Sequence, residues 1–411
     1  MPGCGRPGTS DRASNASRHD LGTGAAYSGR GSRLLLSRAR WLPVAGLAIA
    51  AALLPQIAFA HALLLQSDPA PDAVLPTSPA VVALIFTEPV TPAGAGIKVF
   101  SPSGHQVAGP VSSRGSALSA RISSTETGTF VVSWQVFAAD THPSRGAFRY
   151  VVGRPSSNPY SSLLGGEIGT ATPLGLFVQA LARWVHFVGF ALVFGLVGYD
   201  VLTSQRARSN RLVSLGVILL IGAEPLALIG QLASLSFDGD TAIAVLASGF
   251  GRLLALRFGG ALLVWALRTL EAPWPILGVG AAIALVDGAS AHAIAGLPGV
   301  GQMLVAIHVG AIGLWVGGLA AFLIAPDRRF GRYAATLFGI AVVTGLALAA
   351  AHVGLSTALM TSEYGLALMT KVLVVGGVVS FALLRRRRLE FGSLLAVLAI
   401  AALLASLPPP R

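Results

Sequence analysis

A series of apolar segments runs from Pro173 onward and limits the folds that this chain can adopt. Each segment is near the roughly 20 residues that a helix needs to cross a bilayer. Hydrophobic residues make up 54% of the chain and charged residues 11%, which is too apolar for a soluble protein. We therefore predict that residues 173–411 form an all-α polytopic bundle in a lipid bilayer. It has about eight transmembrane helices, near 174–202, 211–235, 252–269, 273–295, 300–325, 332–353, 365–385 and 391–408.

Arginines between these segments predict their orientation. Loops rich in arginine stay on the cytoplasmic side of a membrane. In this chain, arginines follow the first, third, fifth and seventh segments, at 206–211, 268, 328–332 and 385–388. Arg252 and Arg257 are exceptions. We expect a multi-pass protein of the bacterial cytoplasmic membrane, with its N-terminal part on the extracytoplasmic side.

Residues 1–60 read as a leader followed by a signal peptide. Arginines precede an apolar run at 41–57, and Ala58-Phe59-Ala60 ends it in the small-x-small pattern of a cleavage site. Cleavage after Ala60 would make His61 the first residue, so that its α-amine and imidazole could chelate a metal together. The alternative is an uncleaved anchor, with His61 as an ordinary loop residue.

Residues 61–153 carry the pattern of a small all-β domain. Val82, Leu84 and Phe86 alternate, and further short runs of β-branched and aromatic residues lie at 97–100, 130–136 and 147–152. Glycine, proline and serine separate these runs, so we predict an Ig-like β-sandwich with Trp134 in its core. Residues 154–172 have the composition of a linker.

Charge and motif content exclude several functions. Residues 61–172 hold six basic and six acidic side chains, so nucleic acid is not an expected partner despite the net charge of +12. The single cysteine, Cys4, lies in the leader, and no Gly-rich phosphate loop is present. We therefore expect neither a disulfide, nor a thiolate metal site, nor ATP hydrolysis.

One short motif in the β-domain suggests metal binding. In an extended Asp140-Thr141-His142 segment, the carboxylate and the imidazole would point to the same face. With the amine and imidazole of His61 they make a set of three nitrogens and one oxygen, which suits Cu(II). Taken alone, a solvated Asp140–His142 loop pair is the better interpretation, and a terminal His61 favours the metal site.

Residues 61–152 resemble the CopC family of periplasmic copper-binding proteins. The matching pieces are His61-Ala62, 67–70, 86–90, Trp134, 140–142 and 146–148. The resemblance implies a sandwich that holds Cu(II) through His61, Asp140 and His142. Glu88 matches a family acid that can lie near the metal, with a surface carboxylate as the alternative. No methionine lies between residues 61 and 302, so we expect no Cu(I) site in this domain.

Residues 174–408 resemble the CopD family, the membrane partner of CopC. The matching pieces are His308-Val309-Gly310, 314–318, and Tyr364-Gly365 with Leu368 and Lys371. The resemblance implies that the helical part transports copper.

Ligand-type side chains fall in the outer half of the predicted helices. Imidazole and thioether bind copper, and thioether favours Cu(I). Hydrogen bonding between helices is the alternative role for each histidine. Two acids, Glu224 and Asp287, could form an ion or proton relay, or pack in their neutral form. The candidates for a copper path are His186, His292, His308, His352, Met303, Met360 and Met369.

Together these patterns predict a non-enzymatic protein of copper uptake, homeostasis or resistance. It would capture Cu(II) outside the membrane and carry copper across, in part as Cu(I). A periplasmic copper chaperone or a reductase is a candidate partner. One alternative is a haem-containing membrane electron carrier that reduces captured copper, which requires paired histidines on facing helices. Another is an oxidative enzyme built on the terminal histidine.

Overall fold

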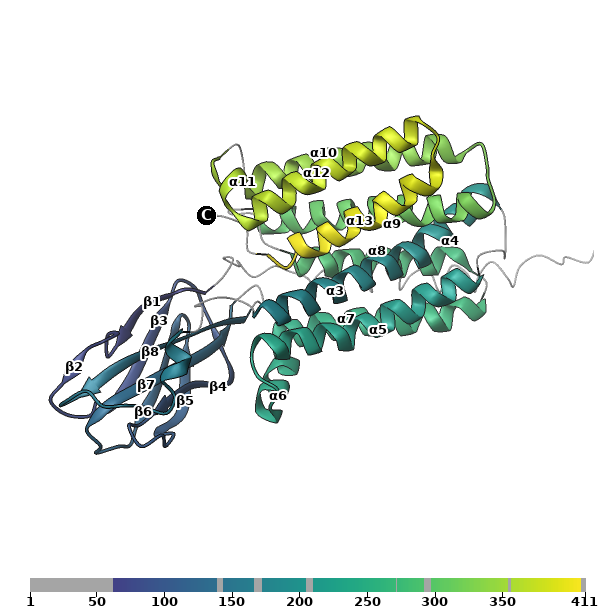
Figure 1. Cartoon of the computed structure of the whole chain (residues 1–411). Coiled ribbons are helices and arrows are strands. Elements are labelled where there is room, and N and C mark those ends of the chain that lie inside the picture. The colour runs from purple at the N-terminus through teal and green to yellow at the C-terminus, as the bar shows by residue number, and fades with distance from the viewer. Residues whose placement is uncertain are drawn as a thin grey trace, which may run out of the picture. The chain divides into compact units, whose positions relative to one another are not determined.

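The computed structural model describes residues 62–138, 143–165, 172–204, 210–270, 272–291, 297–353 and 356–407. It confirms the predicted fold class, because a β-sandwich is followed by a helical region (Figure 1).

The sandwich consists of two four-stranded sheets. Its first sheet has the order β1-β3-β6-β5 and its second the order β2-β8-β7-β4. Strands of the first sheet are β1 (Leu64–Asp68), β3 (Val81–Phe86), β6 (Ala117–Ile122) and β5 (Ala108–Arg114). Those of the second are β2 (Val74–Leu75), β8 (Pro143–Val152), β7 (Gly128–Phe137) and β4 (Thr91–Phe100).

The core of the sandwich follows the predicted alternation. Val82, Leu84 and Phe86 are all buried, because side chains two residues apart on a strand share a face. Trp134 is 1% exposed, and its ring meets Phe86 edge-on with 5.1 Å between the ring centroids. Trp134 is therefore a core residue, as predicted.

Part of the segment predicted as a linker packs on the sandwich. The Asn158 amide donates hydrogen bonds to the backbone carbonyls of Ser101 and Thr129, each at 2.9 Å. Tyr160 stacks on Phe100 with the ring centroids 3.8 Å apart, and the short helix η1 (Ser161–Gly165) follows. These contacts close one end of the sandwich.

Each of the eight predicted segments contains a helix. The first is α3 (Pro173–Phe190), which continues through the π-helical turn η2 (Ala191–Gly195) into α4 (Leu196–Thr203). The others are α5 (Asn210–Ser234), α7 (Gly249–Leu267), α8 (Pro273–Ala289), α9 (Pro298–Ile324), α10 (Phe330–His352), α12 (Glu363–Leu383) and α13 (Arg387–Leu404). The short helix η3 (Arg268–Leu270) follows α7 at the end of its predicted segment. Two further helices of the described helical part, α6 (Gly239–Ala247) and α11 (Ala358–Thr361), lie outside the predicted segments.

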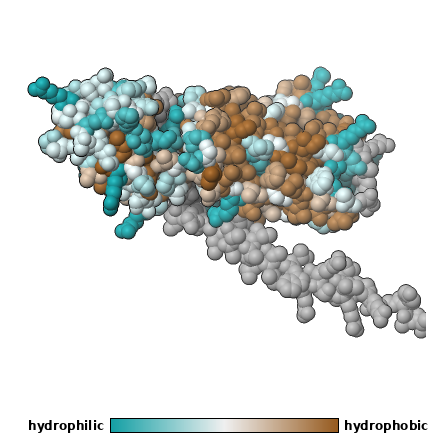
Figure 2. Space-filling view, turned by 90° about the horizontal axis from the view of Figure 1, so that it is seen from below, coloured by the Kyte–Doolittle hydropathy of each residue, from teal (hydrophilic) through white to brown (hydrophobic). Residues whose placement is uncertain are grey.

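Six helical segments in the described part of the chain are long and apolar enough to cross a membrane. The count of eight is therefore approximate. Helix α8 has 17 residues, and the first turn of α13 contains Arg387, Arg388 and Glu390. Hydrophobic side chains cover much of the helical surface (Figure 2), with Phe177 64% and Leu373 77% exposed. Such a surface is expected to contact lipid.

Glycines bring α9 against the first helix. A Cβ on Gly317 would lie 1.9 Å from the Ala191 carbonyl oxygen, and one on Gly195 would lie 2.6 Å from the Gly313 carbonyl oxygen. Only glycine allows this approach, which matches the role of small residues at membrane helix interfaces. The helix brought close is the one that carries His186.

Candidate functional site

The three predicted Cu(II) ligands, His61, Asp140 and His142, lie outside the described residues. The structure describes the chain on either side of them, and the geometry of these flanks bears on the site.

A buried hydrogen bond joins the two ligand-bearing segments. The Ser144 hydroxyl donates to the Ala62 carbonyl at 2.7 Å, and the two residues are 3% and 0% exposed. Ala62 directly follows His61, and Ser144 lies two residues after His142. This bond from the Ser144 side chain to the Ala62 backbone brings the residue after His61 against the start of β8, two residues after His142.

Glu88 lies beside this junction and is buried. The Leu63 amide donates to Thr87 Oγ1 at 3.0 Å, and the Thr87 amide donates back to the Leu63 carbonyl at 2.9 Å. The next residue, Glu88, is 2% exposed, so it is not the surface carboxylate of the alternative interpretation. A buried carboxylate close to a predicted metal ligand is suited to orient that ligand or to compensate the charge of a metal.

The start of β8 is fixed against the core tryptophan. Gly146 pairs with Trp134 across the sheet, and a Cβ on Gly146 would lie 2.6 Å from the indole ring. The ring therefore packs directly on the Gly146 backbone. This packing holds the strand that begins just after His142.

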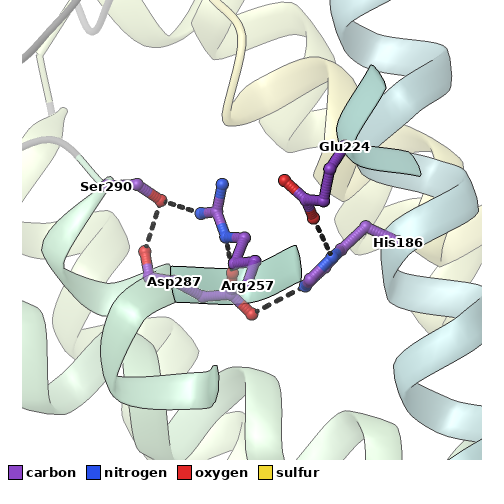
Figure 3. Close-up of polar contacts among 5 residues, drawn as sticks. All are labelled: His186, Glu224, Arg257, Asp287 and Ser290. Atoms are coloured by element: carbon purple, nitrogen blue, oxygen red, sulfur yellow. Dashed lines mark hydrogen bonds and ion pairs between the residues drawn. The ribbon is translucent and has the colours of Figure 1, made fainter. Parts of the chain in front are cut away.

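In the helical part, four helices contribute to one buried ionic cluster (Figure 3). His186 Nδ1 lies 3.2 Å from a Glu224 oxygen, and Nε2 lies 3.1 Å from an Asp287 oxygen. Arg257 Nε donates to the other Asp287 oxygen at 2.8 Å, and the same guanidinium contacts the Ser290 hydroxyl. We call His186, Glu224, Asp287 and Arg257 the ionic cluster. Two positive and two negative groups balance there when His186 carries both ring protons.

The ionic cluster lines a cavity of about 190 Å³ within the helices. His308 and His352 line the same cavity, together with Tyr364 and Lys371. His308 Nδ1 lies 3.0 Å from Thr344 Oγ1, and His352 Nδ1 lies 2.9 Å from the Leu348 carbonyl oxygen.

The other predicted path residues are not placed in this cavity. His292 lies outside the described residues. Met303, Met360 and Met369 are 51%, 68% and 38% exposed, and none of them lines the cavity. Among the residues that the structure describes, no three His, Cys, Asp or Glu side chains converge in a geometry that holds a metal.

Sequence reasoning missed Arg257 as a site residue, treating it as an exception to the charge rule. The signal was present, because an arginine inside an apolar helix needs a buried partner. Asp287, 30 positions later, is that partner. Lys371, which belongs to the segment that resembles CopD, also lines the cavity.

Comparison with known protein families and solved structures identifies the class of the N-terminal domain. The family model of the CopC domain matches residues 64–153, so the sandwich is a CopC domain. CopC from Methylosinus trichosporium OB3b is 25% identical, with a TM-score of 0.22; the match covers 24% of this chain and 100% of that one. PcoC, a methionine-rich copper resistance protein from Escherichia coli, is 26% identical, with a TM-score of 0.21. That match covers 23% of this chain and 100% of PcoC. No curated protein matches the chain.

These matches cover the sandwich, and the CopD resemblance of the helical part stays a prediction. The haem-containing alternative finds no support in the described residues. Both ring nitrogens of His186 face carboxylates, which leaves neither of them for an axial bond to iron.

Proposed function

We propose that this protein captures Cu(II) with its CopC domain outside the cytoplasmic membrane and moves copper across through its helical part. The role is one of binding and transport, without a catalysed reaction. The observation that carries the proposal is the buried bond from Ser144 to Ala62. It supports a site in which the amine and imidazole of His61 meet Asp140 and His142.

The ligand chemistry supports Cu(II) as the captured ion. Two imidazoles, one amine and one carboxylate give the nitrogen and oxygen donors that Cu(II) prefers in tetragonal geometry. Each nitrogen must be deprotonated to bind, so affinity should fall as the pH drops below about 6.

The helical part supports passage of the ion. In the part of the chain that the structure describes, six helical segments are apolar and long enough to cross a membrane, and three histidines line one cavity within the bundle. If copper continues as Cu(I), one electron per ion must be supplied from outside the chain. A reductase is therefore the partner that this route requires.

Electron paramagnetic resonance of the mature chain in lipid nanodiscs tests the outer site. We expect one Cu(II) per chain, with nitrogen hyperfine structure, when the chain begins at His61. One extra residue ahead of His61 should weaken binding about as much as His142→Ala. The matched control is His105→Ala, because His105 is an exposed turn residue that matches no ligand position. Equal binding by the extended chain would exclude the terminal amine as a ligand.

A further inference from the structure

We propose that His308 presents an unprotonated Nε2 to the cavity as an intramembrane ligand for Cu(I). Thr344 is the positioning residue that fixes this tautomer, and His186 is held in the ionic cluster as a charge partner. This inference rests on the proposed function. It assigns metal binding to His308 and charge balance to His186.

Hydrogen-bond accounting at Thr344 gives the tautomer of His308. The Thr344 hydroxyl has one hydrogen, and its best acceptor is the Ile340 carbonyl oxygen at 2.7 Å. This bond to the preceding turn of the helix is common for threonine. Thr344 Oγ1 can then only accept at the 3.0 Å contact with His308, so Nδ1 must donate. In a neutral imidazole, the lone pair therefore lies on Nε2.

The packing around His308 holds the ring in place. Gly345 lies beneath the ring, because a Cβ there would come 3.0 Å from His308 Cε1. The ring is thus clamped between the Thr344 hydroxyl and a glycine that leaves room for it. Histidines that bind metals generally donate the other ring N–H to a fixed acceptor, which orients the ring and sets its tautomer. His308 and Thr344 have this arrangement before any metal arrives.

His186 has the opposite arrangement. Glu224 and Asp287 occupy its two nitrogens, and Asp287 is also bound by Arg257. Carboxylates accept hydrogen bonds at both ring positions, so the ring serves as a double donor. Copper binding there would break a buried ion pair, which is costly in a medium without water. His186 therefore balances charge in the cavity and leaves ligation to His308.

The test uses the mature full chain in nanodiscs with ¹⁵N-labelled histidine rings, and Ag⁺ as a redox-inert substitute for Cu(I). We expect the His308 signals, assigned with His308→Gln, to show the Nδ1–H tautomer. Ag⁺ should shift the Nε2 signal and leave the His186 signals unchanged.

Two substitutions of Thr344 distinguish an effect on the His308 tautomer from an effect on helix packing. Thr344→Ser keeps the hydroxyl and should retain both the tautomer and Ag⁺ binding. Thr344→Val keeps the shape and should give mixed tautomers, with Ag⁺ affinity at His308 lowered about 10- to 100-fold. Unchanged His186 signals in Thr344→Val would show that the bundle is folded.

Three results would overturn the inference: an Nε2–H tautomer in the unmodified chain, an Ag⁺ shift at His186 in place of His308, or full Ag⁺ affinity in Thr344→Val. Failure of the proposed function is distinguishable from these. A chain that binds Ag⁺ at His308 but moves no copper refutes transport, whereas a chain that moves copper without Ag⁺ contact at His308 refutes this site alone.

Discussion

Replacing Ser144 by alanine should weaken Cu(II) binding although Ser144 is not a ligand. The hydroxyl bonds to the Ala62 carbonyl at 2.7 Å across 82 residues of sequence. It anchors the backbone that follows His61 to the strand that follows His142. Without it, the N-terminal segment loses a buried partner close to two of the predicted ligands.

The magnitude follows from the burial of the bond. Ala62 is 0% exposed, so its carbonyl would be left in the core without this partner. An unsatisfied buried group of this kind costs about 1–3 kcal/mol. If binding must restore the docked segment, Cu(II) affinity falls by about 5- to 150-fold, since 1.4 kcal/mol is tenfold.

The assay is a Cu(II) titration against a competing chelator with the mature chain in nanodiscs. Ser67→Ala is the matched control, because its hydroxyl also bonds to a buried carbonyl, that of Pro69 at 2.8 Å, but within one short segment. Ser67→Ala should lower stability and leave Cu(II) affinity unchanged. Equal Cu(II) affinity in Ser144→Ala and Ser67→Ala would exclude a role for the Ser144 hydroxyl in docking the segment that follows His61.

Three further predictions concern stability. Gly146→Ala should destabilise the sandwich by about 1–3 kcal/mol, because the new Cβ would lie 2.6 Å from an indole ring; an unchanged thermal midpoint would contradict this. Asp287→Asn should destabilise the bundle by about 3–5 kcal/mol, because it leaves Arg257 of α7 without its buried carboxylate. Thermal unfolding in detergent measures this loss of stability, and Cu(II) binding at the outer site should persist. The hydroxyls of Ser101 and Ser103 lower the pKa of Glu126 below 4.5, so its stabilising contribution is present above that pH and is lost as the pH falls through the folded-state pKa. Glu126→Gln should remove that acid-dependent part, as measured by amide exchange of the sandwich across pH 3–6.

Much of the fold was predictable because it depends on local periodicity. Alternation at Val82, Leu84 and Phe86 marks a half-buried strand, and apolar runs of about 20 residues mark spanning helices. Strand β5 escaped prediction because its sequence, Ala108–Arg114, is mostly exposed and shows no alternation. A strand near the edge of a sheet with little burial leaves a weak signal.

The ionisable residues of the helical site could be predicted one by one, but the hydrogen bonds between them could not. His186, Glu224 and Asp287 each stood out as ionisable groups in apolar helices, which are rare. Their contacts could not be predicted from the sequence. Glu224 and Asp287 lie 38 and 101 positions after His186, and the contacts depend on how three helices are rotated about their axes. Thr344 gave no signal, since a threonine in an apolar helix usually bonds to its own backbone.

Copper uptake by sealed proteoliposomes measures transport by the whole chain. The mature chain would be oriented with its N-terminal domain outside and a copper-sensitive dye trapped inside; Cu(II) is supplied outside first, and a reductant is added there after the outer site has bound it. We expect copper to enter well above the rate of protein-free liposomes, with entry reduced by His142→Ala at low external copper and abolished by His308→Ala at any concentration. Copper transport by this chain would be excluded if entry were no faster than in protein-free liposomes, or if neither substitution changed it at matched protein levels.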